Sequence, residues 1–171
     1  MKTPRRLGSS HKSVLLFLVR CFAYWGLALW GVGRFKQIEE WGTGLTLATL
    51  QIAFRAVGQQ VHRVGSTLSV GGANVEIVSD CSPHMPFLIF GAVILAFPSS
   101  WRRRLLGLVL GAVAIHLFNT LRILTLIWIL RFRYSWFEFA HVYLWQTGTV
   151  LMVFATFALW MRTLPPRREP A

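Results

Sequence analysis

Leu105–Leu130, with the sequence LLGLVLGAVAIHLFNTLRILTLIWIL, decides the class of fold, because Arg122 is its only formally charged residue. A helix needs about 20 consecutive apolar residues to cross a hydrocarbon core of about 30 Å. This stretch exceeds that length, and no proline interrupts it. It therefore predicts a transmembrane helix.

Three further stretches predict membrane helices, at about residues 14–33, 83–99 and 140–161. The second is the weakest, because its apolar part, Met85–Phe97, reaches span length only with its flanks or with local thinning of the bilayer. The composition agrees, with 54% hydrophobic residues, 14% charged residues and a mean hydropathy of +0.52. We expect an all-α polytopic membrane protein, a single membrane domain over residues 1–171 with about four transmembrane helices.

The formal net charge of +12 follows from basic residues that cluster at alternate ends of the predicted spans. Basic residues are enriched in cytoplasmic loops, so the three clusters define the orientation. We expect a protein of the cytoplasmic (inner) membrane, with both termini and the loop 100–104 inside and the segment 34–80 outside. The partner that the charge implies is the lipid bilayer and not nucleic acid. The clusters are Lys2, Arg5, Arg6 and Lys12; Arg102, Arg103 and Arg104; and Arg162, Arg167 and Arg168.

A fifth span over Trp41–Val57 is the competing topology. It would place Arg102–Arg104 on the outer side and bury Arg55 near a helix end. Both consequences conflict with the usual placement of basic residues in membrane proteins. We therefore reject this span.

The outer segment is expected to carry two kinds of local structure. Between Gly44 and Val64, apolar residues recur at helical spacing, which predicts a helix lying in the outer membrane interface. Thr67–Val70 and Val75–Val78 are rich in β-branched residues and flank Gly71–Asn74, which predicts a short β-hairpin. Such a hairpin would deliver the next segment to the membrane surface.

Cys81 is the candidate nucleophile and lies in SDCSPH, residues 79–84. Ser82 can cap a helix and Pro83 can take its first position, where no amide is needed. The positive end of such a helix favours a thiolate. The alternatives are a buried packing residue and a disulfide with Cys21. The disulfide is excluded, because Cys21 lies near the inner end of the first span and bonded cysteines need Cα atoms within about 7 Å.

Two further candidates lie at the depth of the outer leaflet. Arg122 follows Leu105 by about 17 residues, which places it about 26 Å from the inner end of its span. An arginine there costs at least about 2.5 kcal/mol, so it faces protein or a wet cavity unless it snorkels to the outer headgroups. His141 opens the last span and suits a general base, unless it is a simple interfacial residue. His84, three residues after Cys81, is the rival base.

A metal site is the other use of these residue types. Cys81 and His84 have a C-x-x-H spacing, Asp80 adjoins them, and His141 could add a fourth ligand. No second pair of closely spaced ligands completes the set. We therefore expect neither a metal nor another cofactor.

The three segments, in this order, resemble the exosortase and archaeosortase family of membrane-embedded cysteine transpeptidases, in particular its short, exosortase H-type members, over about Gly65–Arg162. In that family a cysteine opens one helix, an asparagine followed three residues later by an arginine lies within the next, and a histidine opens the helix after it. One departure is Pro83, which stands where family members usually carry glycine and removes an amide that could face an oxyanion. The matching residues here are Cys81, Asn119 with Arg122, and His141.

The resemblance implies a substrate and a reaction. The substrate would be an exported protein with a C-terminal sorting signal, made of a short motif, a transmembrane helix and a basic tail. Cys81 would form a thioester with the motif, and His141 would act as general acid and base. Arg122 would stabilise the oxyanion or orient the carbonyl, with Asn119 in a supporting position. His84, to which the resemblance gives no role, is a further supporting candidate. Water as acceptor gives proteolysis and another nucleophile gives transfer; the alternative is a non-catalytic membrane subunit in which Arg122 pairs with a partner.

Overall fold

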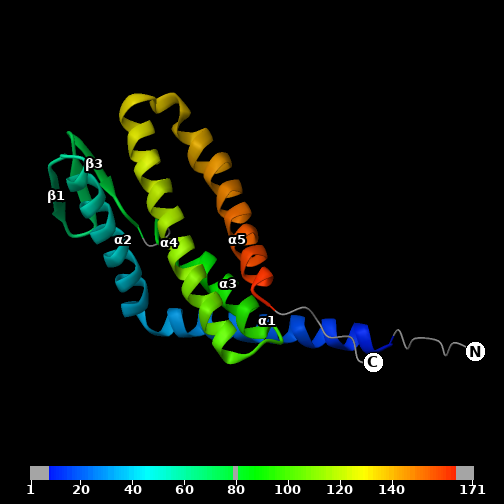
Figure 1. Cartoon of the computed structure of the whole chain (residues 1–171). Helices are drawn as coiled ribbons and strands as arrows, with labels where there is room; N and C mark the ends of the chain where they lie inside the picture. The colour runs from blue at the N-terminus through cyan, green and yellow to red at the C-terminus, as the bar shows by residue number, and fades with distance from the viewer. Residues whose placement is uncertain (1–7, 79–80, 165–171) are drawn as a thin grey trace, which may run out of the picture.

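The computed structural model describes residues 8–78 and 81–164. Helices dominate these residues, and a small antiparallel sheet lies between the second and third helices along the chain (Figure 1). The elements in chain order are α1 (Gly8–Arg34), α2 (Lys36–Ala56), β1 (Val61–Val64), β2 (Thr67–Val70), β3 (Ala73–Glu76), α3 (His84–Ala96), α4 (Trp101–Phe132), the 3₁₀-helix η2 (Tyr134–Trp136), the π-helix η3 (Phe139–Leu144) and α5 (Trp145–Arg162).

Among the described residues, three helices are long and apolar enough to cross a membrane: His11–Arg34, Trp101–Phe132 and Tyr134–Arg162. They contain the three longest predicted spans, which confirms the prediction of an all-α membrane protein. α3 has 13 residues and is about 20 Å long at 1.5 Å per residue, shorter than a hydrocarbon core of about 30 Å. It corresponds to the weakest of the four predicted spans and is a shorter apolar helix outside the three candidate spans. α2, which contains most of Trp41–Val57, is not one of the three candidate spans.

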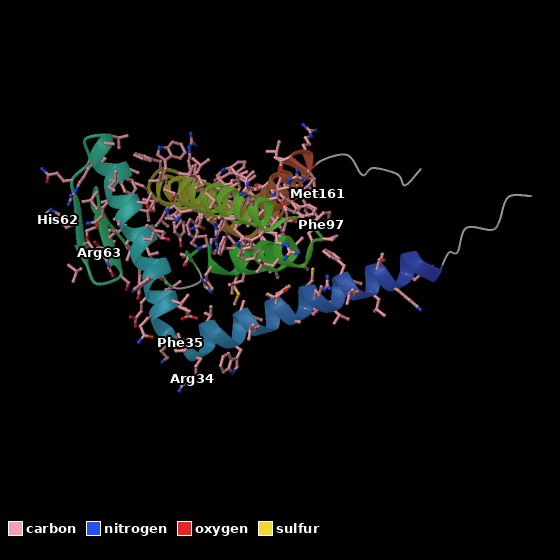
Figure 2. The ribbon with its side chains drawn as sticks, turned by 60° about the horizontal axis from the view of Figure 1, so that its bottom comes forward. Arg34, Phe35, His62, Arg63, Phe97 and Met161 are labelled. Atoms are coloured by element: carbon pink, nitrogen blue, oxygen red, sulfur yellow. The ribbon has the colours of Figure 1, made fainter. Side chains whose placement is uncertain are left out.

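α1 and α2 meet at a corner at Phe35, whose backbone leaves the helical region with φ −120° and ψ 86°. Figure 2 shows Arg34 and Phe35 at this corner, with the two helices running from it in different directions. α1 packs mainly against α3 and lies at a wide angle to α4 and α5 in Figure 1. Many of its large apolar side chains are exposed, as suits a helix surrounded by lipid.

The predicted interfacial helix over Gly44–Val64 is wrong at both ends. α2 begins earlier, at Lys36, and ends at Ala56. Gly58 follows with a φ of +75°, a left-handed conformation that glycine adopts readily and that does not continue a helix. Val61–Val64 therefore forms β1, although its valines continue the helical spacing.

The predicted β-hairpin is present as β2 and β3. Val70 pairs with Ala73 across a turn whose two central residues, Gly71 and Gly72, have φ of +53° and +84°. Positive φ at both positions is the geometry of a type I′ turn and explains the need for glycine. The second strand begins earlier than predicted, and β1 adds an unpredicted third strand beside β2, in the order β1-β2-β3.

Two apolar clusters hold these elements to opposite halves of α4. The first joins α2 and the sheet to the C-terminal half of α4 through Ile123 and Ile127. Figure 1 shows α2 and the sheet together on one side of that part of α4. The second cluster joins α3, α4 and α5. Its buried residues are Phe90, Ile94, Ile115 and Trp160.

Two glycines allow α3 and α5 to approach the N-terminal half of α4. A Cβ at Gly107 would lie 2.6 Å from Nε1 of Trp160, and a Cβ at Gly111 would overlap the ring of Phe90. Trp160 is fully buried, and its Nε1 donates a hydrogen bond of 2.9 Å to the carbonyl of Arg103. Small residues at such contacts are typical of packed membrane helices. The short α3 is thus held closely against α4.

Candidate functional site

Cys81 lies between the sheet and α3, and its main chain is tied to α4. Its N–H donates to the carbonyl of Val78 at 2.9 Å, and its own carbonyl accepts a hydrogen bond from Nδ2 of Asn119 at 2.8 Å. Asn119 lies in the middle of α4 and is only 6% exposed. A buried amide that bonds a backbone carbonyl restricts that segment to one position. Asn119, predicted as a supporting residue, therefore fixes the start of α3 to α4.

The helix that follows Cys81 begins later than predicted. Pro83 is the residue that caps the helix, and its carbonyl accepts the N–H of Phe87 at 3.2 Å, so His84 is the first residue of α3. Ser82 makes no capping hydrogen bond, and its hydroxyl is buried without a partner among the described residues. The cap assigned to Ser82 and the first helical position assigned to Pro83 were wrong. Cys81 still lies just ahead of a helix N-terminus.

The Cys81 side chain is half-buried and packs against the first apolar cluster. Its thiol is free, as is that of Cys21 in α1. The packing role considered as an alternative is therefore real. It does not exclude reactivity, because part of the side chain remains accessible.

A cavity of about 240 Å³ lies next to this segment, between α3, α4 and α5. Arg122 lines it, and its Nε is buried without a hydrogen-bond partner in the described part of the chain. His84 lines it too, with its Nδ1 equally buried and unpartnered there. Arg122 thus faces the interior of the bundle, as an arginine inside a span is expected to do. Other lining residues are Ser82, Asn119, Thr149 and Met152.

His141 is not among the residues that line this cavity. It lies in η3, the π-helical segment that precedes α5, and its side chain is exposed. Its ring stacks on Phe137, with centroids 5.6 Å apart and an angle of 8° between the planes. π-helical segments are rare and are frequently found at functional sites.

The structure therefore brings part of the predicted site together. Asn119, Arg122 and His84 line one cavity, and Asn119 also holds the main chain of Cys81 beside it. The thiol of Cys81 and the imidazole of His141 lie outside that lining. Of the five predicted site residues, three therefore place their side chains at this cavity, Cys81 brings only its backbone to it, and His141 lies elsewhere.

The residues considered for a metal site include Cys81, His84 and His141, which the structure describes. In the described ranges 8–78 and 81–164, no three His, Cys, Asp or Glu side chains lie close enough to hold an ion. Asp80, which the sequence places beside Cys81, lies outside the described residues.

Two polar features of this region were not predicted from the sequence. Oγ1 of Thr49 and Nε2 of His116 are 2.9 Å apart and link α2 to α4. A signal for this link existed, because His116 and Asn119 are three residues apart and share one face of a helix. Thr149 lines the cavity from α5. No sequence signal marks it, because the rotation of α5 relative to α4 is a property of the packed structure.

Apolar helices of span length, with a cavity among them that Arg122, His84 and Asn119 help to line, define an integral membrane protein with polar side chains inside its bundle. The family model described as transmembrane exosortase matches residues 9–161. Because this match covers most of the chain, the protein belongs to the transmembrane exosortase family. Neither the comparison with curated proteins nor that with solved structures finds a match.

Proposed function

We propose that this chain is a membrane-embedded cysteine peptidase or transpeptidase of the cytoplasmic membrane. Its substrate is an exported protein with a C-terminal sorting signal, made of a short motif, a transmembrane helix and a basic tail. Both termini lie inside, and the site lies near the outer face. Family membership supports a role in the processing of sorting signals, and the basic clusters support the orientation.

The observation that carries the proposal is the hydrogen bond of 2.8 Å from Asn119 Nδ2 to the carbonyl of Cys81. Asn119 and Arg122 are three residues apart on α4, so they lie on the same helix face. The bond therefore holds the nucleophile's backbone next to the helical turn that carries the arginine. Two segments far apart in the sequence, each matching a family motif, are joined in space by this contact.

The proposed reaction is acyl transfer through Cys81. The thiolate attacks the carbonyl carbon of the scissile bond, and the C–N bond breaks as the oxyanion collapses to a thioester. The leaving amine takes a proton from a protonated histidine. The neutral histidine then removes a proton from water, an amine or a hydroxyl, whose attack on the thioester releases the thiolate and the product.

Arg122 stabilises the oxyanion in this proposal. Arg122 lines the cavity, and its buried Nε has no partner among the described residues, so none of these residues competes with a substrate for this N–H. Pro83 offers no N–H, so the guanidinium takes a role that a backbone amide can fill elsewhere. A donor held in place before the reaction needs no reorganisation as negative charge develops.

His141 is the proposed acid and base, because it matches the family motif and lies in a π-helical segment. His84 is the rival, because it lines the cavity together with Arg122. For catalysis the imidazole has to come within about 3 Å of the thiol, and such contacts often tighten only when the substrate is bound. Paired histidine variants decide between the two.

The test is co-expression with a surface protein that carries a motif, a transmembrane helix and a basic tail. Processing of that protein is followed by its change in mass with wild type and with Cys81→Ala. Cys21→Ala is the matched control, because it removes the other free cysteine, which lies in α1 away from the site. We expect Cys81→Ala to abolish processing at normal membrane levels and Cys21→Ala to leave it unchanged.

Unchanged processing by Cys81→Ala would remove the cysteine from the chemistry. The non-catalytic membrane subunit would then be the better description, with the unpartnered Arg122 as the group that pairs with another protein. The test of that description is to purify wild type and Arg122→Ala and to compare the membrane proteins that copurify. Loss of a partner from Arg122→Ala alone would support it.

A further inference from the structure

A second and larger cavity, of about 710 Å³, forms a groove between α3 and α5. Its surface is apolar, and several of its side chains are exposed to the surroundings of the bundle. A groove of this kind in a membrane protein is open to lipid or to another helix. Its walls include Phe17 of α1; Ile89, Phe90 and Val93 of α3; and Val153 and Phe157 of α5.

The groove adjoins the smaller cavity of the proposed site. Met85, Pro86 and Thr149 line both spaces. The groove therefore begins beside the cavity at the start of α3 and extends along that helix as far as Phe97. Phe97 follows Met85 by about 12 residues, which gives the groove a length of about 18 Å at 1.5 Å per residue.

Three residues that line the cavity each carry a buried polar atom without a partner in the described ranges: Nε of Arg122, Nδ1 of His84 and Oγ of Ser82. Nε of Arg122 is a donor, and Oγ of Ser82 can both donate and accept. Nδ1 of His84 donates or accepts according to the tautomer of the imidazole. Leaving such groups unpaired is costly, so they favour a polar ligand. A peptide group offers both a donor and an acceptor and matches this mixture, whereas a phosphate only accepts.

Two of the three helices that line the groove, α1 and α5, bury little of their apolar surface. In the most apolar window of α1 and in that of the span containing α5, no residue is buried within the structure, whereas a third of the window in α4 is buried. Association of membrane helices relies on close packing between such faces. Two unburied spans beside one apolar groove thus leave room for a further helix.

We propose that this groove seats the transmembrane helix of the sorting signal, and that the peptide segment leading out of that helix enters the cavity lined by Arg122 and His84. The inference rests on the proposed function and extends it, because it states where the substrate lies. Met85, Pro86 and Thr149 form the boundary at which the substrate passes from helix to extended peptide. The position of the cleavage point then follows from how far the substrate helix extends along the groove.

Filling the groove with a larger side chain is the first test. Ile89 and Val150 line the groove and are 48% and 52% exposed, so a tryptophan at either position occupies the groove without disrupting a packed core. Val113 is the matched control, because it is 54% exposed on α4 and lines neither cavity. We expect Ile89→Trp and Val150→Trp to slow processing by roughly tenfold, as overpacking of an apolar contact does, and Val113→Trp to resemble wild type.

Photo-cross-linking is the second test and needs no turnover. A photoreactive phenylalanine analogue replaces Ile89 or Val113 in the Cys81→Ala background, so that the co-expressed substrate stays uncut. We expect a cross-link to the substrate's transmembrane helix from position 89 and none from position 113. Cross-links to lipid alone, or normal processing by both tryptophan variants, would overturn the inference.

The two proposals fail in different ways. If Cys81→Ala abolishes processing but position 89 does not cross-link, the chemistry stands and the docking groove is wrong. If Cys81→Ala leaves processing intact but position 89 cross-links to the substrate, the groove stands and the cysteine chemistry is wrong.

Discussion

The N-terminal half of α4 and the middle of the same helix meet their neighbours in opposite ways. At Gly107 and Gly111 the neighbours fill all the space, and the buried Nε1 of Trp160 is paired with the carbonyl of Arg103. At Arg122 the helix faces a cavity, and a buried nitrogen is left without a partner among the described residues. One helix thus carries a tightly packed contact and an open polar site.

The difference shows how a small membrane bundle can separate stability from function. An unpaired buried polar group costs about 1–3 kcal/mol, and native structures tolerate few of them. The packed half of α4 supplies the contacts that hold α3 and α5 in place. The middle can then keep groups unpaired and ready for a ligand. Variants in the first region should change stability, and variants in the second should change processing.

After Cys81→Ala, the histidine variants are expected to give the largest effect on processing. Removal of a general acid and base lowers a rate by about 10²–10⁴-fold. We expect His141→Gln to lower processing within that range and His84→Gln to lower it much less, both at normal membrane levels. Rates from time courses with the co-expressed substrate decide. The reverse ranking would assign the base to the cavity and His141 to the interface.

Arg122→Met is expected to lower processing by about 10²–10³-fold, the usual effect of removing an oxyanion donor. The same change removes a buried N–H that has no partner in the described ranges, so the melting temperature in detergent should stay the same or rise. Arg122→Lys keeps the charge without the planar donors and should recover little activity. A clear fall in melting temperature for Arg122→Met would instead identify a structural arginine.

Gly111→Ala tests the packed half. Its Cβ would overlap the ring of Phe90, and overpacking costs about 1–3 kcal/mol, more than the gain of up to about 1 kcal/mol from replacing glycine in a helix. We expect a lower melting temperature. Gly26→Ala in α1 is the control, because nothing lies within 4 Å of its added Cβ. Equal melting temperatures for the two variants would mean that α3 and α4 are not in close contact.

Trp160→Phe is expected to give the smallest effect, a destabilisation of about 1 kcal/mol, because the carbonyl of Arg103 loses its donor. Trp145 is the matched control, because its buried Nε1 has no partner among the described residues. Trp145→Phe should therefore change the unfolding midpoint less than Trp160→Phe. A larger loss for Trp145→Phe would show that ring volume, and not the hydrogen bond, controls stability here.

Much of the fold was predictable because the thickness of a bilayer sets the length of an apolar helix that crosses it. The stretches 14–33, 105–130 and 140–161 all lie within the three helices that can cross a membrane. The turn at Gly71–Gly72 was predictable for another reason, since two successive positive φ values require glycine. β1 was missed, because the valines at helical spacing outweighed Gly58, which ends α2.

The sequence could predict which residues belong to the candidate site, but not how they are arranged in space. Asn119 and Arg122 share a face of α4 by their spacing alone, and that face does line the cavity. That the Cys81 side chain packs toward the sheet, and that Thr149 belongs to the cavity, depend on how α3 and α5 are rotated against α4. Rotation of neighbouring helices follows from the packing at Gly107 and Gly111, which a single sequence does not reveal.

The π-helical segment Phe139–Leu144 determines the direction in which the His141 side chain points around the helix axis, as well as its position along the chain. Its i→i+5 hydrogen bonds take one residue more per turn than an α-helix, so side chains before it are turned about the helix axis. Thr149 lies on the face of α5 that lines the cavity. His141 lies in the π-helical segment, so its direction around the helix axis differs from the one that a continuous α-helix would give it. Deletion of one residue between Val142 and Leu144 would rotate His141 by about 100° around the axis relative to Thr149.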